Sequence, residues 1–166
     1  PSRLEAVRLP NKPLELINNK EMILHVYDAA IKTNLGDVYV ATPDQKIINL
    51  IKDNGGKAIK TSLSHQTGTD RVYEVFLNQL KSEPNIIVNL QGDMPNIDPK
   101  DIANLISYMN EQKCDIGTLA SSFISDKEIA DINNVKVAVN DPLKNNQFDK
   151  AIDFFRKDEK KYEYFY

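Results

Sequence analysis

Three stretches of the chain carry apolar residues at intervals of three and four, which is the spacing of one face of a helix. They predict helices over residues 21–32, 44–53 and 69–80. A fourth helix is predicted over residues 99–110, because Pro99 suits a first helical turn. Asn54-Gly55-Gly56 follows the second helix, and glycine favours the left-handed conformation in which many helices end.

Short runs rich in apolar and β-branched residues alternate with these helices. They predict strands over residues 37–41, 57–61, 86–90, 116–124, 135–139 and 151–155. Residues 86–90 are nearly all apolar, which is typical of a parallel strand buried on both faces. We therefore expect an α/β fold with a doubly wound, mostly parallel sheet and helices on both faces. Ligands of such sheets bind beyond the carboxyl ends of the strands.

The length of 166 residues suits one domain, and we expect residues 1–166 to form it. The first thirteen residues have a loop-like sequence with no strand before them, although an α/β domain normally starts with a strand. The aromatic stretch 162–166 has no helix cap or turn after it. We therefore expect the domain to be incomplete at both ends, lacking its first strand and a C-terminal part.

Charge and cysteine content exclude some function classes. The net charge of −3 argues against a protein that coats nucleic acid. Cys114 is the only cysteine, so the chain forms no internal disulfide, which fits a reducing compartment. The sequence has no apolar run of transmembrane length and no secretory signal, so we expect a cytoplasmic protein without a membrane partner.

A basic loop opens the chain and carries Arg3, Arg8 and Lys12. Arginine grips two phosphate oxygens at once, and lysine adds a mobile positive charge. The loop is thus a candidate site for a polyphosphate. It contains no glycine, so it is neither a Walker-type loop nor a dinucleotide-binding fingerprint. A solvated basic loop without a ligand is the alternative.

Two further polar clusters follow predicted strands. Residues 65–71 lie between a strand and a helix, where backbone N–H groups favour anions or polar ligand edges, although helix capping alone also explains them. Residues 89–95 place Asp93 at a strand end, with Gly92 allowing close backbone approach. A carboxylate there suits Mg²⁺, which prefers oxygen ligands and substrate phosphates. An aspartate in a tight turn is the alternative.

The three clusters, in this order, resemble the 3-deoxy-manno-octulosonate (Kdo) cytidylyltransferases, also called CMP-Kdo synthetases. The resemblance rests on Pro1-Ser2-Arg3, Arg8-Leu9-Pro10-Asn11-Lys12-Pro13-Leu14, His65-Gln66-Thr67-Gly68-Thr69-Asp70-Arg71 and Asn89-Leu90-Gln91-Gly92-Asp93. It extends over nearly the whole chain to about Arg156. It implies a nucleotide-diphospho-sugar transferase-like fold and transfer of CMP from CTP to the anomeric hydroxyl of Kdo, which supplies lipopolysaccharide synthesis.

The resemblance also implies roles for individual residues. It assigns Arg3, Arg8 and Lys12 to the triphosphate as catalytic residues, and it assigns Asp93 to Mg²⁺. Substrate binding falls to Thr67, Gly68, Thr69 and Arg71, which hold the cytidine, and to Gln91, which lies close to the sugar acid. The family is usually dimeric, so a homodimer is expected of the complete protein.

Two departures from the family pattern leave local contacts open. Met94 follows Gly92-Asp93 where the family commonly has glutamate, and Pro43 follows Ala41-Thr42 where the family commonly has aspartate. Two alternatives to a Kdo enzyme also remain. One is a CMP-sialate synthetase, which has a related fold, and the other is a nucleotide-binding fragment without turnover.

Overall fold

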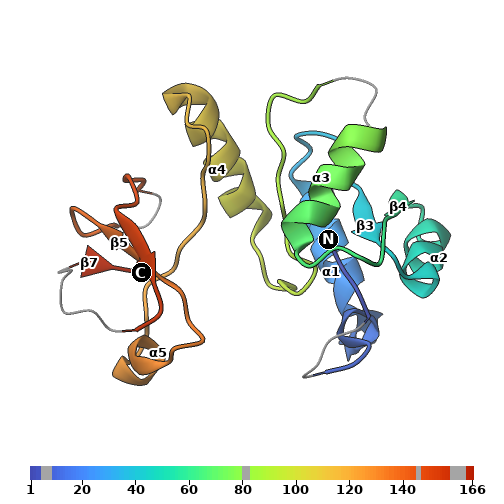
Figure 1. Cartoon of the computed structure of the whole chain (residues 1–166), viewed down its shortest axis with the longest axis horizontal. Helices are drawn as coiled ribbons and strands as arrows, with labels where there is room; N and C mark the ends of the chain where they lie inside the picture. Colours follow the sequence, from blue (N-terminus) through green and yellow to red (C-terminus); the bar gives the residue numbers. More distant parts are fainter. Residues whose placement is uncertain (5–8, 80–82, 145–146, 158–163) are drawn as a thin grey trace. The chain divides into compact units, whose positions relative to one another are not determined.

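The computed structural model describes residues 1–4, 9–79, 83–144, 147–157 and 164–166. The chain forms two compact units, Pro1–Ala103 and Asn104–Tyr166, each of which we describe by itself (Figure 1). The expectation of a single domain stays a prediction. Among the described residues, no helix is long and apolar enough to cross a membrane.

Four helices lie where the sequence predicts them. They are α1 (Met22–Lys32), α2 (Gln45–Asp53), α3 (Gly68–Gln79) and α4 (Pro99–Gln112). Helix α2 ends as the sequence indicates, because Gly55 takes a φ of 74° and its N–H bonds to the carbonyl of Lys52. A side chain would be strained in this conformation, so glycine is the suitable residue here.

Strands β3 (Val40–Thr42) and β4 (Ala58–Lys60) pair in parallel, with Val40 opposite Ala58, and α2 connects them. This βαβ crossover forms the core of the first unit together with α1. Helix α2 packs along both strands, and α3 contacts β3. The buried cluster consists of Ile23, Leu24, Val40, Ile47 and Ile51. Ile47 and Ile51 are fully buried one helical turn apart, as the amphipathic pattern of α2 requires.

The N-terminal segment lies between two other segments of the first unit. The N–H of Ser2 donates to the carbonyl of Ala41 at 3.0 Å, and the carbonyl of Pro1 accepts the N–H of Gly92 at 3.2 Å. A Cβ atom at Gly92 would lie 3.0 Å from that carbonyl oxygen and 3.2 Å from the Ser2 Cβ. The expected close approach of the Gly92 backbone is therefore confirmed.

The segment that follows the basic loop is tightly folded. A 3₁₀ turn, η1 (Lys12–Leu14), precedes a short antiparallel hairpin of β1 (Leu16–Ile17) and β2 (Lys20–Glu21). Asn18 and Asn19 form its two-residue turn with φ values of 50° and 63°. Asparagine tolerates positive φ better than most residues, which suits this turn.

The second unit contains a three-stranded antiparallel sheet in the order β6-β5-β7. Its strands are β5 (Lys136–Val139), β6 (Asp153–Phe155) and β7 (Tyr164–Phe165). The strands predicted over residues 135–139 and 151–155 are thus confirmed at slightly shorter lengths. Helix α5 (Asp126–Ala130) starts at Ser125, whose side chain accepts the N–H of Glu128.

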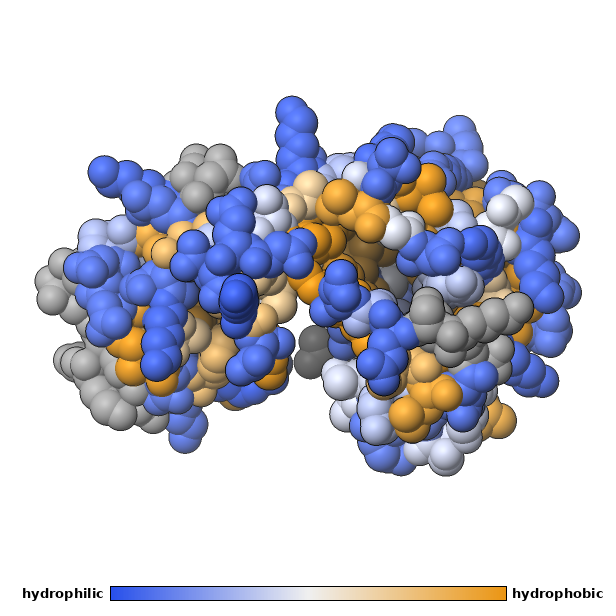
Figure 2. All heavy atoms as spheres, turned by 90° about the horizontal axis from the view of Figure 1, so that it is seen from above, coloured by the Kyte–Doolittle hydropathy of each residue, from blue (hydrophilic) through white to orange (hydrophobic). Residues whose placement is uncertain are grey.

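Two strand predictions are wrong, because residues 86–90 and 116–124 form no strand in the described part of the chain. Ile87 and Val88 are 46% and 45% exposed, and Ile116 and Ile124 are 89% and 88% exposed. An apolar run becomes a strand only when a neighbouring strand completes its hydrogen bonds. Figure 2 shows that apolar (orange) atoms occur among the polar ones on the visible face of the molecule.

The described residues therefore form an α/β protein with three small sheets, of which the β3–β4 sheet is parallel. The finer expectation of one doubly wound sheet stays a prediction.

Candidate functional site

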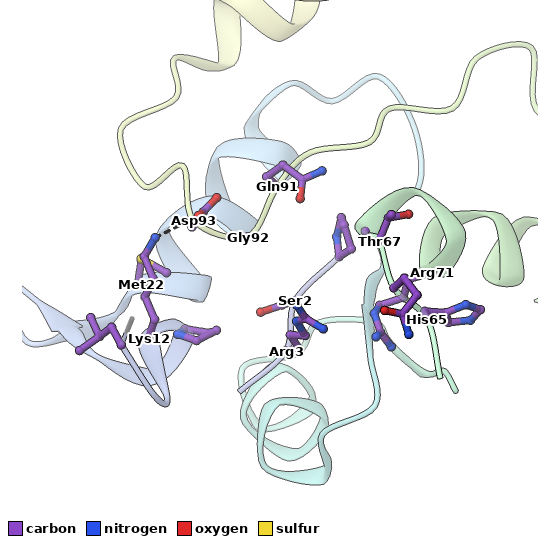
Figure 3. Close-up of a pocket in the computed structure, with 15 residues that line it drawn as sticks. Ser2, Arg3, Lys12, Met22, His65, Thr67, Arg71, Gln91, Gly92 and Asp93 are labelled. Atoms are coloured by element: carbon purple, nitrogen blue, oxygen red, sulfur yellow. Dashed lines mark hydrogen bonds and ion pairs between the residues drawn. The ribbon is translucent and has the colours of Figure 1, made fainter. Parts of the chain in front are cut away.

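A cavity of about 690 Å³ opens in the first unit (Figure 3). Three segments of the chain form most of its walls, namely the N-terminal segment, the stretch from the end of β4 into the first turn of α3, and the stretch after residue 90. Met22 at the start of α1 also lines it. Seven of the nine predicted site residues line it: Arg3, Lys12, Thr67, Gly68, Arg71, Gln91 and Asp93. The structure therefore brings the three sequence clusters to one place.

The other two predicted residues lie elsewhere. Arg8 lies outside the described residues, so its predicted role stays a prediction. Thr69 lies on α3 outside the cavity lining, where its hydroxyl accepts a hydrogen bond from the Asn89 amide at 3.1 Å. Thr69 thus borders the site through Asn89.

Lys12 and Asp93 form an ion pair across the cavity, with 3.0 Å between Nζ and Oδ2 (Figure 3). The side chains are 40% and 54% exposed. An ion pair this exposed contributes at most about 1 kcal/mol to stability. Both side chains therefore remain accessible to a charged ligand at little energetic cost.

Arg3 belongs to the anchored N-terminal segment and projects an exposed side chain into the cavity lining. Its following residue is also held, because the N–H of Leu4 donates to Oδ2 of Asp44 at 2.8 Å. The sequence carries no signal for this contact of Asp44, because Asp44 stands 40 residues from Leu4 and lies at the predicted start of a helix.

Thr67 and Asp70 cap the start of α3 through reciprocal hydrogen bonds. Asp70 Oδ2 accepts hydrogen bonds from both the N–H and the hydroxyl of Thr67, and the Thr67 hydroxyl oxygen accepts the Asp70 N–H at 3.1 Å. The Thr67 hydroxyl bond, followed by the backbone bond, lowers the pKa of Asp70. The predicted capping function is confirmed, and Thr67 lines the cavity as well.

Arg71 is 3% exposed, although its position borders the cavity. Its Nη1 donates to the Thr61 hydroxyl and to the Ser62 carbonyl. Burial, and then the positive charge of Arg3, lower the pKa of Arg71. The guanidinium thus supports the stretch that follows β4 and adds positive potential to the cavity wall.

Gln91 is held by a chain of side-chain amides. Its Nε2 donates to Oδ1 of Asn89 at 3.0 Å, and the Nδ2 of Asn89 donates to Thr69. Asn89 belongs to the polar cluster 89–95, so the sequence indicates that it lies near the site. Its contact with Thr69 of α3 has no sequence signal.

His65 lines the cavity as well, and its side chain contacts Glu74 of α3. The His65 Nε2 hydrogen bonds to Glu74 Oε2, which also accepts the Ser62 N–H at 2.9 Å. The Ser62 bond, followed by the His65 bond, lowers the pKa of Glu74. These contacts fasten the stretch after β4 to α3.

A metal site made by protein side chains alone is absent from the described residues, which contain no group of three His, Cys, Asp or Glu side chains. Asp93 supplies one half-exposed carboxylate to the cavity, beside the cationic Lys12. Mg²⁺ commonly takes one or two carboxylates and completes its shell with water and substrate phosphates. The residues present therefore fit a Mg²⁺ ion that binds together with a polyphosphate.

Comparison with known proteins gives a consistent result. Residues 1–166 match the family model described as cytidylyltransferase. The chain is 38% identical over 157 residues to the 3-deoxy-manno-octulosonate cytidylyltransferase of Brucella ovis. It is 40% identical over 153 residues to the enzyme of the same name from Rickettsia felis. These matches cover 94% and 92% of the chain and 62% of each relative.

A solved structure of CMP:2-keto-3-deoxy-manno-octonic acid synthetase complexed with CTP is also similar, with a TM-score of 0.76 and 38% identity. The match covers 94% of this chain and 61% of that one. The chain thus spans a little over three fifths of the length of the proteins that it matches.

Proposed function

The chain belongs to the cytidylyltransferase family, and from this premise we propose that it is the nucleotide-binding part of an enzyme that transfers CMP from CTP to Kdo. The observation that carries the proposal is the meeting of Arg3, Lys12 and Asp93 at one cavity. Relatives named as Kdo cytidylyltransferases at 38–40% identity support the choice of both substrates.

In the proposed reaction, the anomeric hydroxyl oxygen of Kdo attacks the α-phosphorus of CTP. A new oxygen–phosphorus bond forms, and the bond from the α-phosphorus to the bridging oxygen breaks. Pyrophosphate leaves with the electron pair of that bond, and the hydroxyl proton passes to solvent. Catalysis of such a transfer consists mainly of positioning and charge neutralisation.

Different cavity residues bind the phosphates, the cytidine and the sugar acid in this proposal. Arg3 and Lys12 bind phosphate oxygens, and Arg8 does so by the family resemblance. The wall formed by Thr67, Gly68 and Arg71 holds the cytidine, with Thr69 supporting it through Asn89. Gln91, fixed by Asn89, faces the sugar acid.

Mg²⁺ is part of the proposal as the cofactor. Asp93 would hold it together with the nucleotide phosphates, and the ion supplies additional neutralisation of the phosphate charge. Binding of the nucleotide gives Lys12 a phosphate partner in place of Asp93. The exposed ion pair between them therefore separates without a large loss of stability.

The fold of the complete protein, its oligomeric state and its compartment are proposed from the same family. We propose one doubly wound sheet for the complete protein, supported by the parallel β3–α2–β4 crossover and by the place of Pro1 and Ser2 between Ala41 and Gly92. A cytoplasmic homodimer that serves lipopolysaccharide synthesis completes the proposal. The lone, exposed Cys114 fits a reducing compartment.

The test is release of pyrophosphate by the purified full-length protein with CTP, Mg²⁺ and one sugar acid at a time. We expect release with Kdo, none with N-acetylneuraminate, and none with Kdo when EDTA removes the metal. Release with N-acetylneuraminate alone would identify a CMP-sialate synthetase. Binding of CTP without release in either mixture would identify a nucleotide-binding protein without turnover.

A further inference from the structure

Asp44 stands at the N-cap position, directly before the first residue of α2, but its side chain does not cap that helix. Aspartate at this position usually accepts an N–H from the first turn of its own helix. Among the described residues of α2, none donates to the Asp44 side chain. Its Oδ2 instead accepts the N–H of Leu4, which is 40 residues away, at 2.8 Å. The carboxylate thus contacts the N-terminal segment rather than its own helix.

The turn before α2 holds Asp44 in place for this contact. Pro43 fixes its own backbone φ, and the N–H of Asp44 donates to the hydroxyl of Thr42 at 3.2 Å. Thr42 itself is fully buried at the end of β3. The carboxylate therefore extends from a rigid strand end.

Two anchors flank Arg3 as a result. The Ser2 N–H before it is bonded to the Ala41 carbonyl, and the Leu4 N–H after it is bonded to Asp44. The Arg3 backbone is thus fixed on both sides, while its side chain remains exposed at the cavity. A fixed backbone reduces the conformational entropy that Arg3 loses when it binds an anion.

Charge supports the same arrangement. Arg3 lies close enough to Arg71 for its positive charge to lower the Arg71 pKa, while the Asp44 charge acts in the opposite direction. Asp44 therefore offsets the repulsion between two cations at one end of the cavity.

We propose that Asp44 is a positioning residue, which accepts the Leu4 N–H and thereby directs Arg3 toward the triphosphate of the bound nucleotide. The inference rests on the proposed function, because it takes CTP as the ligand that Arg3 meets.

The test compares three Asp44 variants of the full-length protein with a matched control, using the Kd for CTP from calorimetry and the kcat and KM for CTP from pyrophosphate release. Asp44→Ala removes the acceptor, and we expect Kd and KM to rise about five- to tenfold, the effect of about one lost hydrogen bond, with kcat changed less. Asp44→Asn keeps an acceptor oxygen and should bind CTP within about threefold of the wild type. Asp53→Ala at the far end of α2 is the control and should change neither constant.

Asp44→Ser separates positioning from helix stability. Its hydroxyl is one bond shorter, and serine is a good helix cap, so α2 is stabilised while the Leu4 contact is lost. We expect an unfolding temperature at least equal to that of Asp44→Ala, together with the same weakened CTP binding. Asp44→Ser binding as tightly as the wild type would overturn the inference.

A double-mutant cycle with Arg3 gives the sharpest result. If Asp44 acts through Arg3, Asp44→Ala in an Arg3→Ala background weakens CTP binding by less than about twofold. Full additivity of the two losses would overturn the inference. Failure of the wild type to bind CTP would instead refute the proposed function, so the two failures are distinguishable.

Discussion

The Nζ atom of Lys12 lies 3.0 Å from Oδ2 of Asp93, although the two residues are 81 positions apart in the chain. One belongs to the basic loop at the start of the chain, and the other follows the predicted strand 86–90. Their contact joins the positive and the acidic parts of the candidate site. In the proposed function, each group keeps this partner until a nucleotide and Mg²⁺ bind.

Replacement of Asp93 by asparagine tests the proposed metal ligand. The amide is nearly the same size but lacks the charge, so we expect pyrophosphate release to fall by about 100-fold or more. The unfolding temperature should change by less than about 4 °C, because the lost ion pair is half exposed. Asp53→Asn serves as the control outside the cavity. Wild-type turnover by Asp93→Asn would refute the metal assignment.

Replacement of Lys12 by methionine tests the phosphate contact. Methionine keeps much of the apolar stem and removes the charge, so we expect KM for CTP to rise about 10- to 100-fold, as for the loss of a charge-assisted hydrogen bond. Lys12→Arg should recover part of this loss. Lys32→Met, at the exposed end of α1, should leave KM unchanged. Steady-state kinetics at varied CTP measures all three, and an unchanged KM in Lys12→Met would contradict the assignment.

The contacts of Glu74 predict that the stability of the fold depends on pH. Its contacts lower the folded-state pKa below the usual value of 4.5, so the carboxylate stabilises the fold above pH 4.5. That contribution is lost as the pH falls through the lowered folded-state pKa. We expect Glu74→Gln to unfold at a lower temperature than the wild type at pH 7, and the difference to disappear in acid.

Thermal unfolding followed by circular dichroism between pH 7 and pH 2.5 measures the Glu74 effect. Glu83→Gln is the matched control, since Glu83 is exposed and lies outside this contact. Its difference from the wild type should be small at every pH. A Glu74→Gln difference that stays constant with pH would show that the charge has no part in holding the loop.

The hydrogen bonds of Lys136 predict that its replacement strongly destabilises the second unit. It is fully buried, and its Nζ donates to the carbonyls of Asp131, Asn134 and Arg156 at 2.7, 3.2 and 2.7 Å. Lys136→Met would leave these three carbonyls without their donor, so we expect a loss of about 2–4 kcal/mol in the free energy of unfolding. Urea denaturation measures it, with the exposed Lys127→Met as control. A loss no larger than that of the control would contradict this role.

The four long helices could be predicted because their signal is local. Apolar spacing and end residues such as Gly55 lie within each helix or next to it, and no distant contact is needed to interpret them. Helix α5 was missed although Ser125 and Glu128 have the spacing of a capping box, which was a usable signal.

Strands were harder to predict because their stability depends on a neighbour. Residues 135–139 and 86–90 are similarly apolar, but in the described structure only the first of them has paired strands on both sides. Contacts within the site were predictable only in part. The order of the sequence clusters predicted that Arg3, Lys12 and Asp93 meet. The Leu4–Asp44 and His65–Glu74 contacts depend on the folded arrangement of distant segments, so no local pattern indicates them.

Gly92 sets the spacing between the walls of the cavity. Its backbone lies directly against Pro1 and Ser2, where even a methyl group would press on a carbonyl oxygen and on the Ile23 side chain. Any larger residue would push the segment that carries Asp93 away from the segment that carries Arg3. The distance between the segments that carry Arg3 and Asp93 therefore depends on the absence of a side chain at position 92, and so does the size of polyphosphate that fits between them in the proposed function.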